Sequence, residues 1–385
     1  MQTMQVYCDN AATTRPYPEV IQAVSKVMAE VYGNPSSEHR EGREAASILR
    51  KERHQIAVLL GANDGEIYFT SGASEANNWV IRGVMKYMNT NNKTYIITSE
   101  FEHHSVLNTI DEIIGDGITP LYVRPDSDGY IDPADVESLL EKHRGHVGLV
   151  SIMMVNNEIG TIQPIVQIAD ICHRYGVLFH TDATQAVGHM QIDVGCYGVD
   201  LMSWSGHKFH GPRGVGGLYI KSGTKFPNLI CGGMQEKQRR AGTENLPGIV
   251  GMATAMDISI SNILFHDSDL IRTRNWIAEE LCDDGHIHLN GSLGCHVPGI
   301  LNFTIDEIEG ESLLLMLDTY GICVSTGSAC MTDSLEPSHV LRSIGLTREQ
   351  ALCSIRLSFD VGFTFEEAKY VVDTIKKCVS ILRKA

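Results

Sequence analysis

The chain lacks the patterns that would place it in a membrane, outside the cell or on nucleic acid. No run approaches 18 apolar residues, so no transmembrane helix is expected. The first residues, 1–5, do not show the charged-then-apolar pattern of a signal peptide. No basic block stands out, and the formal net charge is −16. We therefore expect a cytoplasmic protein that binds neither nucleic acid nor an anionic membrane directly.

Disulfide and metal-ligand patterns are missing as well. The ten cysteines are scattered without a C-x-x-C pair, which is typical of reduced thiols in a cytosolic protein. The 16 histidines form only one tight cluster, His103-His104, and no H-x-x-x-H spacing falls on a convincing helix. We therefore expect no dedicated metal site. Internal repeats and low-complexity linkers are also absent from the sequence.

What the chain does contain is an alternation of strand and helix patterns through its first two-thirds. Apolar residues recur at helical spacing between Pro18 and Gly33, and strand-like runs occupy 67–70, 95–98 and 147–155. Further strands are predicted near 121–123, 177–180 and 199–203, with helices between them and a glycine-rich turn at 211–217. This alternation predicts a largely parallel sheet that is covered by helices on both faces.

From about residue 246 the pattern changes to a long helix, a few short strands and a C-terminal helix over 366–382. At 385 residues the chain exceeds the usual size of a single domain. We predict a large α/β domain over residues 15–255. A smaller α+β domain should comprise residues 256–385 together with 1–14.

Polar segments follow several of the predicted strands. Four of them are T-S-G-A-S-E (70–75), N-N-E-I-G (156–160), T-D-A-T-Q (181–185) and S-G-H-K (205–208). Ligands of parallel sheets bind beyond the carboxyl ends of the strands. We therefore expect these segments to meet at one binding site.

Lys208 and Asp182 are the most informative pair. Each follows one of two neighbouring predicted strands. The lysine amine could form a Schiff base with an aldehyde cofactor, and the carboxylate could keep a pyridinium nitrogen protonated. A glycine-flanked lysine is more often a surface turn residue, so this segment alone leaves both interpretations open.

Other segments allow a functional and a structural interpretation. Ser74 and the amides of its helix start could bind phosphate or form a plain N-cap. His103 could stack on a planar cofactor and shuttle protons, or cap a surface helix. The amides of 156–157 end an apolar strand, where they could bind a ligand or build a turn. Arg356, between apolar neighbours, could pair with a buried carboxylate or clamp a substrate carboxylate.

Residues 325–338 are small and polar around one cysteine, Cys330. A loop this poor in apolar groups should be mobile and exposed to solvent. A reactive thiolate is found in such a setting, whereas an inert structural cysteine is usually buried. The composition therefore favours a functional thiol at Cys330.

Taken together, the ordered motifs resemble the cysteine desulfurases of the fold-type I, class V aminotransferase-like group, which use pyridoxal 5'-phosphate. The resemblance covers nearly the whole chain. It rests on D-N-A-A-T-T (9–14), Y-G-N-P-S-S (32–37), T-S-G-A-S-E (70–75), E-H-H (102–104), V-N-N-E-I-G (155–160), H-T-D-A-T-Q (180–185), S-G-H-K (205–208), R-R-A-G-T-E-N (239–245) and S-T-G-S-A-C (325–330). The long loop after Cys330 and L-E-P-S-H-V-L-R (335–342) are similar to the NifS/IscS-type branch.

The resemblance implies a role for each matching residue. Lys208 would form the Schiff base and later move the Cα proton, and Asp182 would pair with the pyridine nitrogen. His103 would stack over the ring, and Gln185 would donate to the ring oxygen. The remaining cofactor and substrate contacts would come from Ala73, Ser74, Ser205 and His207 (phosphate), Thr243 (phosphate, from the neighbouring subunit of a homodimer), and Asn157 and Arg356 (substrate carboxylate).

The implied reaction converts L-cysteine to L-alanine and leaves a persulfide on the nucleophile, Cys330. The sulfur would pass to an acceptor, an iron–sulfur scaffold or a tRNA-thiolation protein, and Cys330 could also ligate an iron–sulfur cluster transiently. Ser74 and Met331 depart from the threonine and the small polar residue that are usual there. A selenocysteine lyase, another class V enzyme such as an aminotransferase, or a non-catalytic sulfur or metal scaffold remain alternatives.

Overall fold

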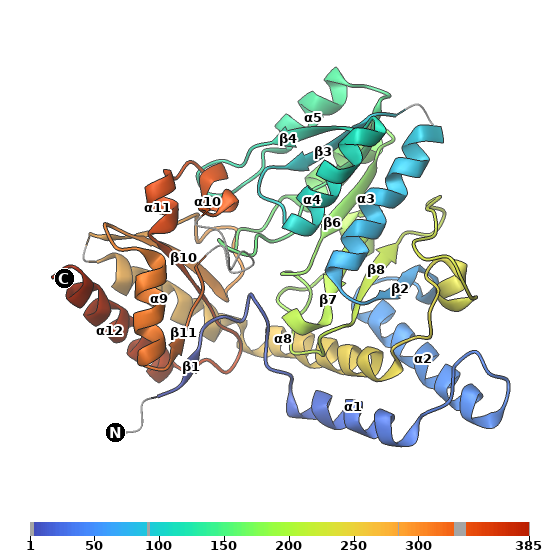
Figure 1. Cartoon of the computed structure of the whole chain (residues 1–385), viewed down its shortest axis with the longest axis horizontal. Coiled ribbons are helices and arrows are strands. Elements are labelled where there is room, and N and C mark those ends of the chain that lie inside the picture. Colours follow the sequence, from blue (N-terminus) through green and yellow to red (C-terminus); the bar gives the residue numbers. More distant parts are fainter. Residues whose placement is uncertain (1–3, 91–92, 284, 327–335, 385) are drawn as a thin grey trace.

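The computed structural model describes residues 4–90, 93–283, 285–326 and 336–384 (Figure 1). Its predicted nucleophile, Cys330, and the neighbouring Met331 lie outside the described residues. The predictions made for the loop around them therefore stay predictions.

A seven-stranded sheet forms the centre of the larger part of the molecule, in the order β2-β8-β7-β6-β5-β3-β4. The strands are β2 (Ile67–Thr70), β3 (Tyr95–Ser99), β4 (Thr119–Val123), β5 (Val147–Ser151), β6 (Leu178–Asp182), β7 (Leu201–Ser205) and β8 (Gly216–Ile220). All neighbours pair in parallel except β8, which is antiparallel to β2 and β7. The largely parallel sheet predicted from the sequence is confirmed.

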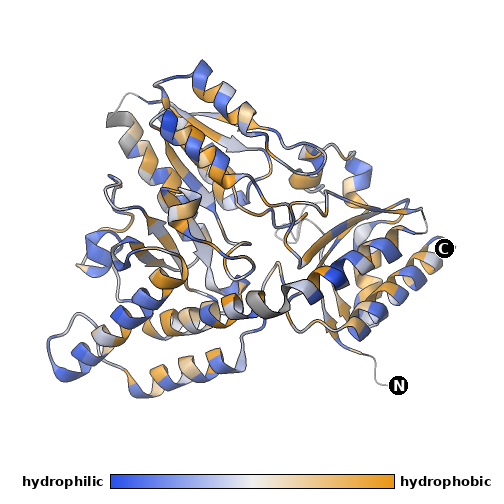
Figure 2. Cartoon of the chain, turned by 180° about the vertical axis from the view of Figure 1, so that it is seen from behind, coloured by the Kyte–Doolittle hydropathy of each residue, from blue (hydrophilic) through white to orange (hydrophobic). Residues whose placement is uncertain are grey.

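Helices cover both faces of this sheet because successive residues of a strand point to opposite sides. Ile96 and Leu201 lie in an apolar cluster with α3 (Ala73–Thr90) and α4 (His104–Ile113). Their neighbours Ile97 and Met202 lie in the cluster on the other face. That cluster includes residues of α1 (Pro18–Glu30), α2 (Arg40–Leu59), α5 (Pro133–Lys142), α6 (Ile165–Arg174) and α7 (Val194–Tyr197). Figure 2 shows mostly apolar strands between helices that carry polar residues on their outer sides.

A second, separate apolar cluster lies in the smaller part. It is built on an antiparallel sheet, β12-β10-β9, and on a parallel pair, β1-β11. The elements are β1 (Val6–Tyr7), β9 (Ile287–Leu289), β10 (Ile300–Ile305), α9 (Gly310–Thr319), β11 (Ile322–Cys323), α10 (His339–Ser343), α11 (Arg348–Leu352), β12 (Ser354–Ser358) and α12 (Phe365–Leu382). Because β1 pairs with β11, the N-terminal segment belongs to the sheet structure of the C-terminal part.

One long helix, α8 (Leu246–Cys282), contributes to both clusters (Figure 1). Met252 packs in the larger cluster and Ile277 in the smaller one. The predicted domain boundary, between residues 255 and 256, falls inside this helix and stays a prediction. Residues Leu246–Ile263 are long and apolar enough to cross a membrane by length and composition alone, but 56% of this window is buried inside the protein. The window therefore has the packing of a core helix.

Two segments differ from the sequence prediction. The strand predicted over 147–155 ends at Ser151. Met154 still donates a hydrogen bond to Asp182 at the end of β6, but its carbonyl accepts from Gln163, and Val155 bridges to Ile162. The predicted glycine-rich turn contains the start of β8. A Cβ atom on Gly217 would lie 2.1 Å from the Trp204 ring, so glycine is needed there for close packing of the sheet.

Candidate active site

A cavity of about 620 Å³ lies at the carboxyl ends of β6 and β7. Its lining includes residues from both parts of the molecule, such as Ala12 near β1 and Arg356 on β12. The predicted site residues that line it are Ala73, Ser74, His103, Asn157, Asp182, Gln185, Ser205, His207, Lys208 and Arg356. Of the predicted residues that the structure describes, only Thr243 does not line this cavity. The structure thus brings together segments that lie far apart in the sequence.

Lys208 ends a short 3₁₀ turn, Gly206–Lys208, that follows β7 directly. Its amine Nζ donates to the backbone carbonyls of Ala11, at 2.6 Å, and Ala12, at 2.9 Å. Both carbonyls belong to the N-terminal segment that follows β1. The lysine is therefore a partly buried residue of the cavity wall rather than a surface turn residue.

Asp182, at the end of β6, is 4% exposed and accepts hydrogen bonds on both carboxylate oxygens. Asn77 Nδ2 donates to Oδ2 at 2.6 Å, and the backbone N–H of Thr184 donates to Oδ1 at 3.0 Å. The Thr184 hydroxyl also donates to Oδ1. These donors fix the position of the carboxylate, which could pair with a pyridine nitrogen.

His103 is the N-cap of α4, and its Nδ1 accepts a hydrogen bond from the backbone N–H of Ser105 at 3.0 Å. Burial lowers the pKa of this imidazole, which favours the neutral ring. His103 also lines the cavity, so this residue both caps α4 and can contact a molecule bound in the cavity. Ser105 accepts from Asn77 at 2.9 Å and thereby links His103 to the Asn77–Asp182 pair.

The phosphate-binding prediction falls on the start of α3. Helix α3 begins at Ala73, where backbone N–H groups have no partner within the helix and attract anions. Gly72 has a φ of +156°, and a Cβ atom there would lie 3.3 Å from the Ser205 hydroxyl oxygen. Burial and the charges of Lys208 and Arg213 lower the pKa of His207 to about 4. The cavity therefore combines helix amides, a hydroxyl and cationic groups, which suits a phosphate.

Arg356 is 3% exposed and forms one of the two interactions that its sequence context allows, an ion pair with a carboxylate. Nη2 lies 2.8 Å from Oδ1 of Asp9, and Nη1 donates to the Asn157 carbonyl at 2.9 Å. Its Nε is buried and has no partner among the described residues. An unpaired buried donor on a cavity-lining arginine fits the predicted contact with a substrate carboxylate.

The two asparagines at the end of the apolar strand have different positions. Asn156 Oδ1 accepts from the backbone N–H groups of Glu158 and Ile159, so this residue builds the turn. Asn157 lines the cavity. Gln185 lines it too and donates one N–H to the Ala11 carbonyl at 2.8 Å. A side-chain amide has a second N–H, so this contact is compatible with the predicted donation to a ring oxygen.

The residues present fit pyridoxal 5'-phosphate. The cavity holds an amine for an aldehyde, a carboxylate for a pyridine nitrogen and an anion site for a phosphate, contributed by Lys208, Asp182 and the start of α3. The buried Asn77 Oδ1 has no partner among the described residues. No group of three or more His, Cys, Asp or Glu that could hold a metal ion is found in the described part of the chain.

The described chain on either side of Cys330 bonds to Arg356 in the cavity wall and to Glu158, the residue that follows the cavity-lining Asn157. Ser325 exchanges backbone hydrogen bonds with Arg356, at 2.6 and 3.1 Å. The Ser338 hydroxyl donates to Oε2 of Glu158 at 2.5 Å. Thr243 does not line the cavity of its own chain, so its predicted role needs a second subunit and stays a prediction.

Sequence reasoning missed several contributors to the site. Asn77 lies one helical turn after Ala73, so its spacing along α3 was a signal that it lies on the same helix face, where it donates to Asp182 behind the cavity wall. Arg213 carries a cationic side chain to the cavity from the glycine-rich segment. The carbonyls of Ala11 and Ala12 act through the backbone, which leaves no side-chain signal in the sequence.

Comparisons with known proteins agree with this site. The family model for Aminotransferase class-V matches residues 6–371. The cysteine desulfurase IscS of Dictyoglomus turgidum is 43% identical over 380 residues, covering 98% of this chain and 95% of the relative. The solved structure of a NifS-like protein has a TM-score of 0.92 at 37% identity and covers 98% of this chain and 100% of its own.

A further solved structure, of SspA in complex with cysteine, has a TM-score of 0.81 at 33% identity and covers 92% of this chain and 99% of its own. The sequence matches and the structural matches thus cover nearly the whole length of the chain. The chain belongs to the class-V aminotransferase family, within it to the cysteine desulfurases, and its cofactor is pyridoxal 5'-phosphate.

Proposed function

We propose that this enzyme removes the sulfur from L-cysteine, releases L-alanine and carries the sulfur as a persulfide on Cys330. The observation that supports this most is the meeting of Lys208, Asp182 and Arg356 in one cavity. The described chain before Cys330 bonds to Arg356 in the cavity wall, and the chain after it bonds to Glu158, the neighbour of the cavity-lining Asn157. The relatives named cysteine desulfurase and the cysteine complex of SspA support the same substrate.

Each cavity residue has a role that follows from its position. Arg356 and Asn157 hold the carboxylate of the amino acid, which orients its Cα towards the Lys208 amine. Asp182 would keep a pyridine nitrogen protonated, and Asn77 and Thr184 hold the Asp182 carboxylate in place. When bound, pyridoxal 5'-phosphate supplies the electron sink for loss of the Cα proton. Lys208 takes that proton and can return it.

Sulfur transfer requires a thiolate. The Cys330 thiolate forms an S–S bond to the substrate sulfur while the bond between that sulfur and Cβ breaks. The electron pair of the broken bond goes to the carbon skeleton, and protonation at Cβ completes alanine. The persulfide then passes its outer sulfur to a thiol of an acceptor, for which we propose an iron–sulfur scaffold or a tRNA-thiolation protein. We further propose a cytoplasmic homodimer in which Thr243 of one subunit completes the phosphate site of the other.

The test is the Cys330→Ala variant, compared with Cys323→Ala and Cys353→Ala as controls. Mass spectrometry after addition of L-cysteine should find a sulfur adduct on the peptide that contains Cys330 and on no other cysteine peptide. Cys330→Ala should still bind cysteine, because Lys208, Asp182 and Arg356 are intact, but alanine and sulfide release should collapse. An adduct mainly on Cys323 or Cys353, or full turnover by Cys330→Ala, would refute the proposal. Parallel assays with selenocysteine test the lyase alternative.

A further inference from the structure

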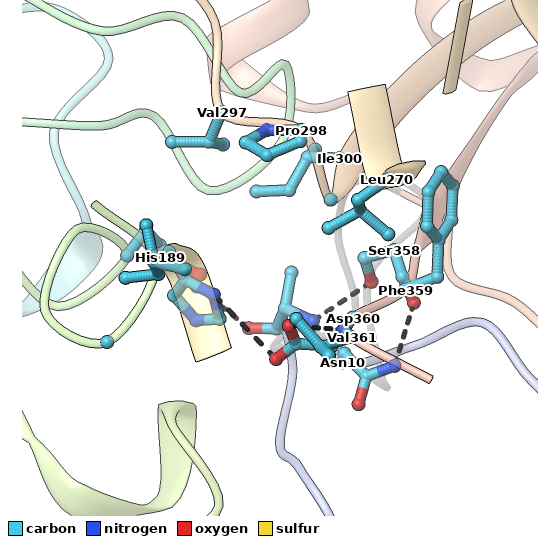
Figure 3. Close-up of a pocket in the computed structure, with 15 residues that line it drawn as sticks. Asn10, His189, Leu270, Val297, Pro298, Ile300, Ser358, Phe359, Asp360 and Val361 are labelled. Atoms are coloured by element: carbon cyan, nitrogen blue, oxygen red, sulfur yellow. Dashed lines mark hydrogen bonds and ion pairs between the residues drawn. The ribbon is translucent and has the colours of Figure 1, made fainter. Parts of the chain in front are cut away.

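A second, smaller cavity of about 30 Å³ lies beside the active-site cavity, and Ala11 and Gln185 line both. Figure 3 shows its wall, where His189 and Asp360 face each other. His189 comes from the segment between β6 and α7, and Asp360 follows β12. Neither residue has a role in the reaction as described above.

His189 contacts the backbone of the active-site lysine. Its Nε2 lies 2.9 Å from the carbonyl oxygen of Lys208. A carbonyl only accepts, so Nε2 carries a proton and donates it. The other ring nitrogen, Nδ1, lies 3.8 Å from Oδ2 of Asp360, which is an ion-pair distance rather than a hydrogen bond (Figure 3). His189 thus stands between the Lys208 turn and the Asp360 carboxylate.

His210, two residues after Lys208, has both ring nitrogens against acceptors. Nδ1 lies 2.7 Å from the carbonyl oxygen of Arg15, and Nε2 lies 2.8 Å from Oδ2 of Asp360. If Asp360 is ionised, both nitrogens must carry a proton, so the ring is an imidazolium. The side chains of His210 and Asp360 are 11% and 12% exposed, so the pair is mostly shielded from water.

The surroundings support this charge state. The titratable groups that face the pair are His189 and Tyr17, whose ring stacks on His210 at 4.2 Å. Burial acts to lower the pKa of His210, but Asp360 raises it above its ordinary value. Burial acts to raise the pKa of Asp360, but His189 and His210 hold it below its ordinary value. Both directions favour the ion pair.

The backbone at His210 is also held in an uncommon conformation, with a φ of +66°. Such a conformation is strained for a residue with a Cβ and persists only where the surrounding contacts determine it. Those contacts are a hydrogen bond from the His210 N–H to the Thr14 hydroxyl, at 2.6 Å, and the two ring contacts. The turn that carries Lys208 is therefore fixed by His210 on its C-terminal side.

We propose that Asp360, His210 and His189 form a positioning network that fixes the backbone of Lys208 from the smaller part of the molecule. Asp360 follows the strand that carries Arg356, so one segment holds the substrate-carboxylate residue and the support of the lysine turn. This inference rests on the proposed function, because it assigns the network its effect through proton transfer by Lys208.

The charge state can be measured without turnover. In the holoenzyme with ¹⁵N-labelled histidine, NMR should still show two ring N–H protons on His210 at pH values above the ordinary histidine pKa of about 6.5. In Asp360→Asn one of these protons should disappear, because a neutral amide can donate to Nε2 and no longer favours the imidazolium. The His210 signals are assigned with His210→Gln. Titration of His210 near its ordinary pKa in the wild type would overturn the network.

Turnover tests the positioning role. Asp360→Asn should lower kcat for L-cysteine about tenfold, which corresponds to a rise of about 1.4 kcal/mol in the activation free energy. KM should change little, because Arg356 and Asn157 remain. The pH dependence of the visible absorbance of the loaded enzyme should shift as well, since the surroundings of Lys208 change. An unchanged kcat and absorbance profile, or a rise in KM alone, would overturn the proposal.

Two further comparisons separate the network from general damage. Asp306→Asn is the matched control, because Asp306 also lies beside two histidines, His286 at 3.7 Å and His288 at 3.1 Å, but is 44% exposed. It should leave kcat and the absorbance profile unchanged. His189→Gln keeps a donor for the Lys208 carbonyl and should retain most of kcat. His189→Leu removes that donor, so its kcat should fall. Equal effects of these two variants would contradict positioning through that hydrogen bond. A wild-type enzyme without activity on cysteine would instead refute the proposed function, whatever the NMR result.

Discussion

The hydrogen bonds described for Lys208 and Asp182 come from neutral groups. The lysine amine donates to two backbone carbonyls, and the aspartate accepts from an amide, a hydroxyl and a backbone N–H. These contacts fix where the amine and the carboxylate lie in the cavity wall.

Lys208→Ala should abolish turnover and covalent attachment of the cofactor, because the variant lacks the amine that reacts with the aldehyde. The fold should survive, since the described contacts of Nζ are with two carbonyls at the cavity wall. Borohydride reduction followed by mass spectrometry measures the attached cofactor. Lys221→Ala is the control, because Lys221 also follows a strand of the sheet but pairs with Asp200. A Lys208→Ala variant that still retains the cofactor covalently would show that another amine binds it.

Asp182→Asn should keep the cofactor but slow Cα proton loss. Loss of a buried hydrogen bond to a charged group costs about 1.5–3 kcal/mol, or roughly ten- to hundredfold in rate. Exchange of the substrate Cα proton with deuterated solvent measures this step directly. Asn77→Ala, which removes a donor but leaves the carboxylate, should have a smaller effect. The assignment fails if exchange in Asp182→Asn proceeds at the wild-type rate.

At this scale the sequence predicted the side chains that line the cavity, because motifs after parallel strands converge at one edge of the sheet. It did not predict the partners that hold those side chains. Asn77 and Ser105 lie inside helices, where polar residues are ordinary, and their contacts depend on how α3 and α4 pack. His210 and Asp360 are 150 residues apart, and nothing in either segment indicates the other.

Among the elements, β8 is the strand that determines how closely the start of α3 approaches the sheet. Gly216 lies in β8, where it pairs with Ser205 of β7 and with Thr70 of β2, just before the turn that leads into α3. A Cβ atom on Gly216 would lie 2.4 Å from the carbonyl oxygen of Trp204 and 2.7 Å from Cα of Gly72. Both are backbone atoms, which cannot move aside as a flexible side chain could. The phosphate-binding turn therefore depends on a glycine in the neighbouring strand.

Gly216→Ala should destabilise the protein by about 1–3 kcal/mol, the usual cost of overpacking, and weaken cofactor binding by displacing the turn at Gly72. Chemical denaturation and titration of the cofactor-free protein with pyridoxal 5'-phosphate measure the two effects. Gly115→Ala is the control, because a Cβ atom there meets nothing within 4 Å. Unchanged stability and affinity in Gly216→Ala would mean that β8 and the turn move apart easily.

The longer helices could be predicted because their apolar periodicity extends over many residues, and most strands of the large sheet because they are short apolar runs between helices. The short helices α7, α10 and α11 were not predicted, since four or five residues show no periodicity. The start of β8 could not, since glycines at 216 and 217 indicate a turn unless the Trp204 side chain that packs on them is known. The end of β5 was misplaced for a related reason. Residues 152–155 are as apolar as a strand, but their hydrogen bonds with 161–163 depend on the tertiary structure.

For the molecule as a whole, the protonation of Glu158 makes the free energy of unfolding depend on pH. Its side chain is buried, accepts from Ser338, and burial raises its pKa to about 7. In the unfolded chain the pKa is that of an ordinary glutamate, about 4.5. The folded state therefore binds a proton more tightly, and deprotonation opposes folding as the pH rises from about 4.5 to 7.

Glu158→Gln should remove this dependence. The free energy of unfolding of the wild type, relative to the variant, should fall by about 3 kcal/mol across that range and level off above it. Denaturant titrations at a series of pH values measure the difference, in which the titration of other groups cancels. Two parallel curves would show that Glu158 titrates in the folded protein as it does in the unfolded chain.

Neither the homodimer nor the sulfur acceptor could be predicted from the folding of one chain, since both depend on contacts with a second molecule. The same holds for Thr243, which can act only on a second subunit's cavity. These predictions rest on the family resemblance and on the absence of Thr243 from the lining of its own cavity among the described residues.

The pairing of β1 with β11 has a consequence for biosynthesis. Val6 pairs with Ile322, so 322 − 6 = 316 residues separate the two partners in the chain. At 5–20 residues per second the ribosome needs roughly 15–60 s to make that stretch. Until then β1 has no strand to pair with. The larger part, including the contacts of Ala11 and Thr14 with Gln185 and His207, can thus begin to fold early, whereas the N-terminal strand finds its partner only near the end of translation.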